Sequence, residues 1–258
     1  RAQSKGLELI ADTAQGLPRR LRGDPGRLRQ ILTNLAGNAI KFTENGEVVI
    51  KVSVEEETTT HATLRFSVID TGIGISQEAQ DRLFKSFSQA DSSTTRKYGG
   101  TGLGLAISKQ LVGMMKGEIG VNSEEGQGST FWFTAKFEKQ TGAPKKPRSP
   151  IKNLFNLRVL VVDDNDTNRQ ILQHQITAWK MQLGSAASGK EALKILREAA
   201  NQGEPFDLAL LDMQMPEMDG LMLSKAIKAD PMIAQTRLIM LTSLGSSFSA
   251  PELKELGL

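Results

Sequence analysis

Aspartates stand at the ends of two apolar runs in the second half of the chain. The run RVLVV precedes Asp163 and Asp164, and the run LALL precedes Asp212. If these runs are parallel strands, their carboxyl ends share one sheet edge, where three carboxylates would repel unless a hard cation such as Mg²⁺ joined them. An aspartate can also accept a phosphoryl group, and Thr242, which ends the next run, could contact it. Taken separately, each aspartate is also explained as an ordinary turn residue.

A second candidate site is a polar stripe on a predicted helix of residues 24–42. At 100° per residue, Asn34, Asn38 and Lys41 lie within about 60° of one another, beside the apolar face of that helix. Amide oxygens can bind Mg²⁺, and a lysine can meet a phosphate. Taken alone, however, this stripe is better explained as a solvated helix edge.

A third candidate is the segment RFSVIDTGIGIS. Asp70 shares its strand parity with apolar residues, so its carboxylate should point with them and need a hydrogen-bond donor. The amino group of adenine could be that donor, and Gly72 and Gly74 would let the backbone approach a flat ring. An Asp-Gly turn at a strand end is an equally common explanation.

The segment YGGTGLGLAIS is a fourth candidate. Gly100, Gly102 and Gly104 precede or open a predicted helix that starts at about Leu103. The free N–H groups and the dipole at such a helix start favour phosphate. The spacing matches neither the Rossmann nor the Walker A pattern, so the cluster is weak evidence by itself.

The elements that must position these residues fall into two groups. Before a Pro- and Lys-rich segment, we predict the helices 24–42, 77–84 and 103–115 and the strands 47–54, 64–70, 118–123 and 130–137. After it, the strands 158–163, 182–187, 207–212 and 237–242 alternate with the helices 167–180, 190–200 and 220–229. Strands that alternate with helices indicate a parallel sheet covered on both faces. We therefore expect an α/β protein with domains at 1–138 and 157–258, joined by a linker at 139–156.

Composition excludes several function classes. The 258 residues contain no cysteine and two histidines, which argues against disulfides, thiolate metal sites and His-rich metal sites. The net charge is +3, and the segment 138–150, with four basic residues and one acidic residue, contributes as much by itself. We therefore expect no nucleic-acid binding.

In combination, the first-half motifs are far more specific than each is alone. The order DPGRLRQILTNLAGNAIKFT, DTGIGIS, LFKSFSQAD and YGGTGLGLAIS closely resembles the catalytic ATP-binding domain of a sensor histidine kinase, in particular of the hybrid class. The resemblance implies three helices against a mixed five-stranded sheet, with ATP and Mg²⁺ as cofactors. It implies that Asn34 and Asn38 face Mg²⁺ and that Lys41 meets phosphate.

The resemblance also assigns the remaining nucleotide contacts. Asp70 would bind the adenine amino group, supported by Thr130 through water. Residues 86–97 would form a mobile lid anchored by Phe84 and Phe87. Arg96 or Lys97 would lie near the γ-phosphate, and the backbone from Gly100 through Gly104 would surround the phosphates.

The second half resembles a response-regulator receiver domain, a flavodoxin-like doubly wound parallel sheet. The resemblance is carried by VLVVDDNDTN, LLDMQMPEMDG and LIMLTS. It implies that Asp212 is phosphorylated, that Asp163 and Asp164 hold Mg²⁺ together with Asp212 and the backbone carbonyl of Gln214, and that Thr242 is the switch hydroxyl. The family's lysine, some twenty residues past that threonine, has no counterpart before Leu258, so we expect an incomplete receiver.

The combined resemblance is to a hybrid kinase that transfers phosphate from Mg-ATP to a histidine and on to Asp212. Neither His61, expected in a polar turn, nor His174, on a receiver helix, fits the acceptor. The implied partners are therefore a histidine-bearing dimerisation domain of the same or a sister chain, and a downstream phosphotransfer domain or response regulator. We expect a cytoplasmic location, with no membrane contact by these domains even within a membrane-bound sensor.

Two other functions stay open. Both domains could be a regulatory nucleotide-binding and receiver module without phosphotransfer. The first domain could instead hydrolyse ATP, as gyrase-type enzymes do with a glutamate base on the asparagine helix. Gln30 stands four residues before Asn34, where that glutamate would lie, which favours a kinase.

Overall fold

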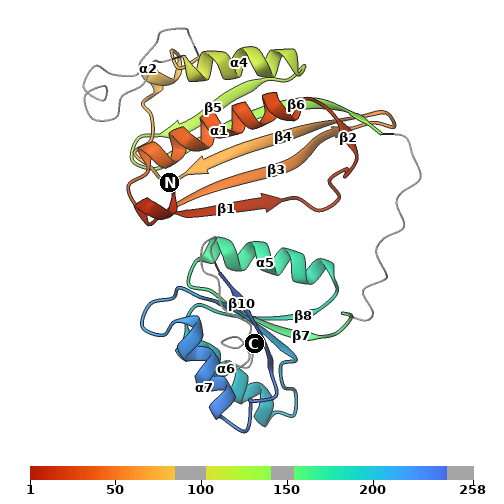
Figure 1. The fold of residues 1–258 in the computed structure, drawn as a ribbon, viewed down its shortest axis with the longest axis vertical. Helices are drawn as coiled ribbons and strands as arrows, with labels where there is room; N and C mark the ends of the chain where they lie inside the picture. Colours follow the sequence, from red (N-terminus) through yellow and green to blue (C-terminus); the bar gives the residue numbers. More distant parts are fainter. Residues whose placement is uncertain (85–102, 141–153, 243–258) are drawn as a thin grey trace. The chain divides into compact units, whose positions relative to one another are not determined.

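The computed structural model describes residues 1–84, 103–140 and 154–242. The chain divides into two compact units, Arg1–Ala143 and Pro144–Leu258 (Figure 1). None of the helices in the described parts combines the length and the hydrophobicity of a membrane span. The exact domain and linker boundaries expected from the sequence stay a prediction.

The first unit is a mixed sheet with its long helices on one face (Figure 1). The strand order is β1-β3-β4-β6-β2, with β5 paired to β6. Among the strand pairs of its described residues, β1 and β3 run parallel and the others are antiparallel. The strands are β1 (Glu8–Thr13), β2 (Leu21–Arg22), β3 (Glu47–Glu57), β4 (His61–Asp70), β5 (Ile119–Glu124) and β6 (Gly128–Lys139). The family resemblance implied five strands. The additional sixth strand is β2, which is too short to give a periodic signal in the sequence.

The first unit has three α-helices in its described part, and a side chain caps the first of them. Helix α1 (Pro25–Phe42) is capped by Asp24, whose carboxylate accepts from the N–H groups of Gly26 and Arg27. Helix α2 (Gln77–Gln80) is shorter than expected, and α4 (Gly104–Met114) matches the prediction within a residue. A short 3₁₀ turn, η1 (Gln3–Lys5), precedes β1.

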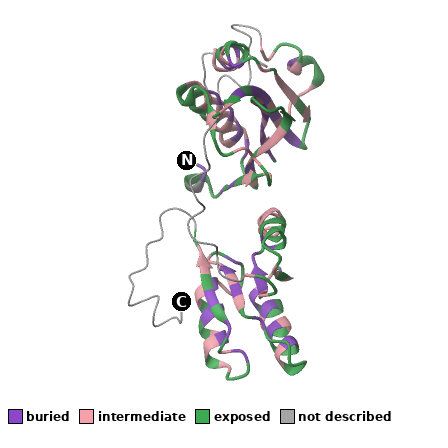
Figure 2. Ribbon diagram, turned by 90° about the vertical axis from the view of Figure 1, so that its right-hand side faces the viewer, coloured by how far each residue is buried: buried purple, intermediate pink, exposed green. Residues whose placement is uncertain are grey.

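Alternating burial along β4 builds the core beneath α1. Every second residue from Ala62 to Asp70 is buried, and the remaining residues are partly exposed. On the buried face, Phe66 stacks on Phe133 with ring centroids 4.8 Å apart. Helix α1 contributes the apolar side of its surface to the same core, through Ile31, Leu35 and Ala39. Figure 2 shows this buried layer along the strands and the facing sides of the helices.

The β3–β4 hairpin is longer than the sequence suggested, and its turn is confined to residues 58–60. His61 therefore begins β4, half-buried, rather than lying in a solvated polar turn. One polar pair crosses this hairpin, since the guanidinium of Arg65 lies 3.4 Å from the carboxylate of Glu55.

The end of β6 is fastened to this hairpin. The ammonium of Lys139 donates to the carbonyl of Thr58 and pairs with Glu57, each at 2.6 Å. Its backbone N–H donates to the carbonyl of Thr60 at 2.7 Å, and the N–H of Gln140 donates to the carbonyl of Arg20 at 3.0 Å. The end of β6 is thus hydrogen-bonded to the rest of the first unit as far as Gln140.

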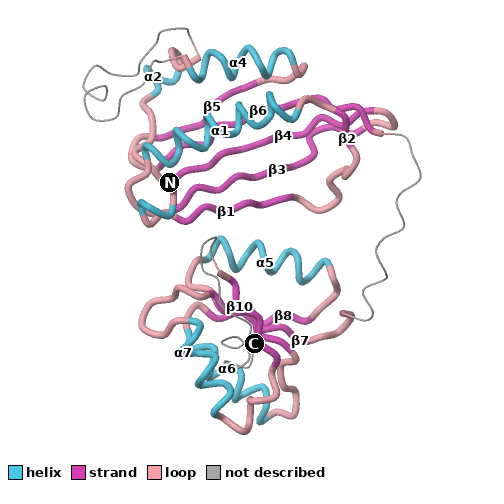
Figure 3. Tube along the Cα trace, in the orientation of Figure 1, coloured by secondary structure: helices cyan, strands magenta, loops and turns pink. Residues whose placement is uncertain are grey.

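The second unit is a parallel sheet with helices on both faces, as predicted (Figure 3). Its strand order is β10-β9-β7-β8. One core cluster gathers around the strands with helices α6 and α7, and a second one joins β7 to Ile176 of α5. The elements are β7 (Arg158–Val162), α5 (Asp166–Ala178), β8 (Gln182–Ala186), α6 (Gly189–Asn201), β9 (Leu208–Asp212), α7 (Gly220–Ala229) and β10 (Arg237–Leu241). The question of a fifth strand falls on residues outside the described ones.

Candidate functional site

The asparagine helix and the glycine-opened helix meet at Asn34. Its side-chain nitrogen donates to the hydroxyl of Ser108 at 2.9 Å, and Ser108 is 1% exposed. A Cβ on Gly104 would lie 2.3 Å from the Asn34 Oδ1 atom, which no real contact tolerates. The carboxamide therefore lies against the first turn of α4, and any larger residue at position 104 would force it to shift.

The start of α4 is suited to an anion. Leu103 precedes the helix, and within the described residues no side chain caps its N–H groups; its first turn also lacks an acidic residue. Asn38 and Lys41 are half-buried on α1, and the Lys41 ammonium lies 4.9 Å from the centroid of the Phe42 ring. The remaining predicted contacts of this region lie outside the described residues: Phe87, Arg96, Lys97, Gly100 and Gly102.

Asp70 is buried, as its strand parity predicted. It is 6% exposed at the end of β4, and its Oδ1 atom accepts from the N–H of Gly72 at 2.9 Å. Burial raises the pKa of this carboxyl above its ordinary value, and backbone hydrogen bonds from Gly72 and Ser129 partly oppose the rise. A buried carboxylate of this kind is ready to accept a hydrogen bond from a bound ligand.

The loop after Asp70 is pressed between two neighbours. A Cβ on Gly72 would lie 2.6 Å from the carbonyl oxygen of Phe42, the last residue of α1. Gly74 has a φ of +69° and would bring a Cβ within 2.0 Å of the carbonyl oxygen of Glu124. Both positions require glycine because another backbone segment lies so close. The loop thus packs between the end of α1 and the β5–β6 hairpin.

The hydroxyl in register with Asp70 belongs to Ser129, and the role expected for Thr130 stays a prediction. Asp70 pairs in register with Ser129, whereas Thr130 pairs with Ile69. Residues in register point to the same face of a sheet, and Ser129 is 7% exposed like its neighbour Asp70. Thr130 therefore lies on the opposite face, so a water-mediated contact from its hydroxyl to the Asp70 carboxylate is not favoured.

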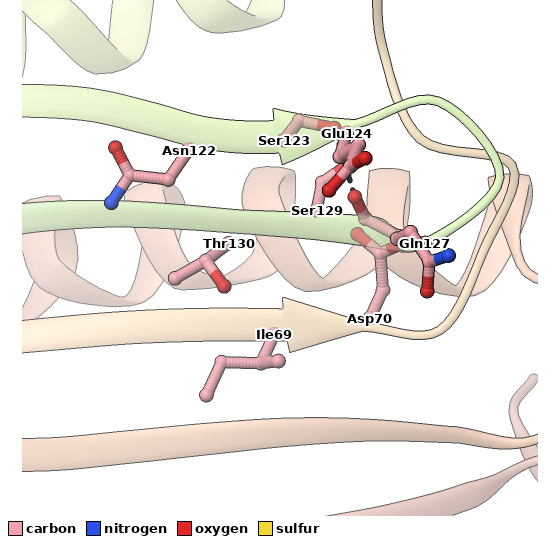
Figure 4. Close-up of a pocket in the computed structure, with 9 residues that line it drawn as sticks. Ile69, Asp70, Asn122, Ser123, Glu124, Gln127, Ser129 and Thr130 are labelled. Carbon is pink, nitrogen blue, oxygen red and sulfur yellow. Dashed lines mark hydrogen bonds between the residues drawn. The ribbon is translucent and has the colours of Figure 1, made fainter.

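A shallow depression of about 380 Å³ lies where the β5–β6 hairpin turns beside the end of β4 (Figure 4). On its inner side, the hydroxyl of Ser123 lies 2.9 Å from that of Ser129 and donates to the carbonyl of Gly128 at 2.9 Å. The lining comes from both faces of the sheet: Ile69, Asp70, Asn122, Ser123, Glu124, Gln127, Gly128, Ser129 and Thr130. It is thus the rim of the region around Asp70 rather than a closed cavity.

Gln80 is a residue that the sequence did not single out. Its side-chain nitrogen donates to the carbonyl of Ile75 at 2.8 Å and to the carbonyl of Ser123 at 2.9 Å. Helix α2 is thereby tied to both the glycine loop and β5. No local pattern could have found this contact, because 43 residues separate Gln80 from Ser123.

In the second unit, the three predicted aspartates come together. Asp163, Asp164 and Asp212 each offer a carboxylate oxygen, and these oxygens all lie within 4.8 Å of one another. Asp163 is 3% exposed, and the N–H of Gln214 donates to Asp212 Oδ2 at 3.1 Å. Such a set of oxygen donors fits a hard divalent cation.

Thr242 lies at the same sheet edge. It directly follows Leu241, which pairs in register with Asp212, and the Leu241 carbonyl accepts from the N–H of Met213 at 3.0 Å. Its side chain is exposed. The predicted switch hydroxyl is therefore one residue from the register partner of the predicted phosphate acceptor.

Arg169 supports the acidic loop and was not predicted. One of its terminal nitrogens donates to the carbonyls of Asp163 and Asp164 at 2.7 and 2.9 Å, and the other pairs with Asp166 at 2.7 Å. Its guanidinium is fixed by the first turn of α5, which Asn165 caps. The arginine thus fixes the backbone of two of the three clustered aspartates.

Comparison with known proteins identifies the family of each unit. Residues 23–139 match the family described as histidine kinase-, DNA gyrase B- and HSP90-like ATPases, and residues 159–258 match the response regulator receiver domain. The chain is 39% identical over 246 residues to hybrid signal transduction histidine kinase K of Dictyostelium discoideum, which covers 88% of this chain and 19% of that protein. The chain carries the ATPase and receiver domains of a hybrid histidine kinase.

Other relatives of this hybrid histidine kinase chain include bacterial sensors. Sensor protein GacS of Pseudomonas syringae pv. syringae is 44% identical over 217 residues, covering 84% of this chain and 24% of GacS. The crystal structure of full-length ShkA in complex with AMPPNP aligns with a TM-score of 0.47 and 23% identity, covering 100% of this chain and 80% of ShkA. The chain spans about a quarter or less of the curated relatives described here.

Proposed function

We propose that the first domain binds Mg-ATP and presents the γ-phosphate to a histidine on a partner domain, and that the phosphoryl group then passes to Asp212. The observation that supports this proposal is that two different segments contact α1 at different points. Asp70 and the Gly72 loop meet its last residue, Phe42. The start of α4 contacts the same helix at Asn34, which lies eight residues, or about 12 Å, before Phe42. One extended nucleotide can span these surfaces, with adenine at the first and phosphates at the second.

Each residue would have a distinct role in holding the nucleotide. The Asp70 carboxylate would accept from the adenine amino group, with Ser129 beside it. The N–H groups at the start of α4 and the Lys41 ammonium would bind phosphate oxygens. The side-chain oxygens of Asn34 and Asn38 would hold Mg²⁺, which supplies positive charge against the phosphates.

Transfer in this domain would rest on positioning and charge neutralisation. The bond between the γ-phosphorus and the bridging oxygen breaks, ADP leaves, and a nitrogen of the partner's histidine ring bonds to phosphorus. Gln30 supports transfer over hydrolysis, because an amide cannot act as the base that deprotonates a water molecule. The acceptor would be the histidine-bearing dimerisation domain of the same or a sister chain.

In the second domain, a carboxylate oxygen of Asp212 would attack the phosphohistidine phosphorus. The N–P bond would break, and the ring would leave as neutral imidazole with a proton on its other nitrogen. Asp163, Asp164, Asp212 and the Gln214 carbonyl would hold Mg²⁺, whose charge offsets that of the incoming phosphoryl group. Arg169 keeps the loop of Asp163 and Asp164 in place. The Thr242 hydroxyl would then bond a phosphoryl oxygen, and a downstream phosphotransfer domain or response regulator would take the group onward.

The test uses the whole 258-residue chain with Mg²⁺, γ-labelled ATP and a purified histidine-bearing hairpin domain. We expect acid-labile label on the hairpin first, then label on the chain that Asp212→Asn abolishes. ATP binding without any label on the hairpin would leave a regulatory nucleotide-binding module. Steady release of phosphate by the chain alone, lost in Asn34→Ala, would indicate a hydrolysing ATPase instead.

A further inference from the structure

The carboxyl end of α1 is closed by two segments that are far apart in the sequence. The last four carbonyls of a helix lack partners within it, and here they belong to Ala39, Ile40, Lys41 and Phe42. The first accepts from the backbone N–H of Thr43 at 3.0 Å, and the last accepts from the N–H of Ile73 at 3.4 Å. The two carbonyls between them are reached by a side chain from the start of the chain.

That side chain is Lys5. Its ammonium donates to the carbonyls of Ile40 at 2.8 Å, Lys41 at 3.0 Å and Thr43 at 3.1 Å. An ammonium has three N–H donors, so these bonds use all of them. A positive charge at this position also complements the negative end of the helix dipole. Lys5 lies before the part of the chain that matches the ATPase family.

The backbone around Lys5 is itself anchored, so its ammonium is delivered from a fixed base. Ala2 and Leu7 are 7% and 5% exposed on either side of it. The N–H groups of Lys5 and Leu7 both donate to the Ala2 carbonyl, at 2.9 and 3.1 Å, and the N–H of Glu8 donates to the Gly46 carbonyl at 3.1 Å. Strand β1 then continues in register with β3.

The helix end that Lys5 closes also contacts the Gly72–Ile73 loop, which follows Asp70. The Phe42 carbonyl accepts from Ile73, and the Cα of Gly72 lies so near it that a Cβ would come within 2.6 Å. The same turn carries Lys41. A frayed last turn would therefore displace both the Gly72–Ile73 backbone and the lysine proposed to meet phosphate.

We infer that Lys5 is a positioning residue for nucleotide binding: its ammonium holds the last turn of α1, and through the Phe42 carbonyl it holds the Gly72–Ile73 loop beside Asp70. This inference rests on the proposed function of the first domain. It also implies that the segment before β1 is a working part of the nucleotide site.

The experiment compares Lys5→Met and Lys5→Arg in the whole chain with two control variants. Lys228→Met removes an ammonium that also bonds two carbonyls, of Ala234 at 3.0 Å and Thr236 at 2.8 Å, but in the receiver. Lys136→Met removes an exposed lysine of β6. Calorimetric titration gives the dissociation constant for Mg-ATP, and amide hydrogen exchange by NMR reports on Ile73 and Thr43.

We expect Lys5→Met to weaken Mg-ATP binding about fivefold, as suits the loss of a cation at a helix end. Exchange of the Ile73 amide should quicken, Lys5→Arg should recover part of both, and the two controls should match the wild type. If a variant were only less stable, its apparent affinity would fall only in proportion to the fraction of protein that is folded and can bind. Titrating well below the thermal midpoint, with about 99% of the protein folded, therefore separates positioning from general destabilisation.

Binding by Lys5→Met within a factor of about two of wild type would overturn the inference. So would weakened binding with unchanged Ile73 exchange, since the loop would then not be the route. If the wild type binds no nucleotide, the proposed function fails, and the exchange data still decide whether Lys5 holds the loop. Should Lys5→Met not fold, Lys5→Gln, whose shorter amide cannot reach all three carbonyls, replaces it with the same expectations.

Discussion

The carboxamide of Asn34 donates to the hydroxyl of Ser108 over 2.9 Å. Gly104, one turn earlier on the same helix, leaves room for the other side of that carboxamide. Residues four apart lie on one face of a helix, so α4 holds the asparagine from two sides at once. The orientation of the amide is therefore set by α4, and this makes α4 part of the proposed phosphate and Mg²⁺ site.

Gly104→Ala should disrupt this arrangement. The new methyl group would lie 2.3 Å from the Asn34 oxygen, and relief of such overpacking typically costs about 1–3 kcal/mol. We expect at least a tenfold loss of Mg-ATP affinity by calorimetry. Gly113→Ala on the same helix is the matched control, because nothing lies within 4 Å of its added Cβ. It should bind normally and stabilise the domain by about 0.5–1 kcal/mol; equal binding by both variants would contradict the predicted role of Gly104.

Asp70→Asn should separate binding from stability. Losing the charged acceptor for adenine is expected to cost about 1.5–3 kcal/mol, or roughly 10- to 100-fold in affinity. The free protein should not lose stability at pH 7, because the asparagine oxygen can still accept from Gly72 and no buried charge remains. Calorimetry and thermal unfolding without nucleotide measure the two effects, and unchanged affinity would remove Asp70 from the adenine site.

The pH dependence of unfolding follows from the raised pKa of Asp70. The folded form binds this proton more tightly than the unfolded form, so the stability contributed by Asp70 is greatest below the ordinary value of 3.8. It falls as pH rises from there through the higher folded pKa, and then stays constant. Asp70→Asn should therefore be more stable than wild type at neutral pH, and this difference should shrink as the pH falls toward 3.8. Urea unfolding at several pH values measures the difference. A difference that grows on acidification would contradict this sign.

Ser129 and Thr130 provide a matched pair for the adenine end of the site. Ser129→Ala removes a hydroxyl on the face of Asp70 and should weaken ATP binding about fivefold, the equivalent of one hydrogen bond of about 1 kcal/mol. Thr130→Val removes a hydroxyl from the opposite face and should bind as wild type does. The reverse result would restore Thr130 as the residue that supports Asp70.

The receiver should be stabilised by Mg²⁺. At a concentration tenfold above the dissociation constant, linkage gives about 1.4 kcal/mol, or roughly 6 °C in its thermal midpoint. Asp164→Asn removes one of the three clustered carboxylates and should abolish most of that shift. Glu217→Gln is the control, since this exposed acid pairs with Lys190 outside the cluster. An Mg²⁺ shift that survives Asp164→Asn would argue against the cluster as the metal site.

Local chemistry made the helices and the buried carboxylate predictable. Asp24 and Pro25 mark the start of α1 by capping and by the fixed proline geometry, and both act within a few residues. The burial of Asp70 followed from its parity with Phe66 and Val68. The clustering of the receiver aspartates followed from the predicted parallel direction of their strands, because parallel strands bring their carboxyl ends to one edge.

Contacts between distant segments could not be predicted in the same way. The bond from Asn34 to Ser108 spans 74 residues, and it depends on how α1 packs on α4. The strand register decides whether Ser129 or Thr130 shares a face with Asp70, because a shift of one residue turns a side chain to the other face of the sheet. The support that Arg169 gives to the acidic loop depends on a side-chain conformation that no spacing rule specifies.

Strand β6 bears on how such kinases can be recombined. One end holds Ser129 beside Asp70, and the other end is fastened through Lys139 to Thr58 and Glu57. A chimera that exchanges receivers between kinases should therefore place its junction after Gln140, whose N–H still bonds Arg20. A junction inside β6 would take the Ser129 end and the Lys139 end of this strand from different parents. It would therefore disturb the proposed adenine site whichever receiver is attached.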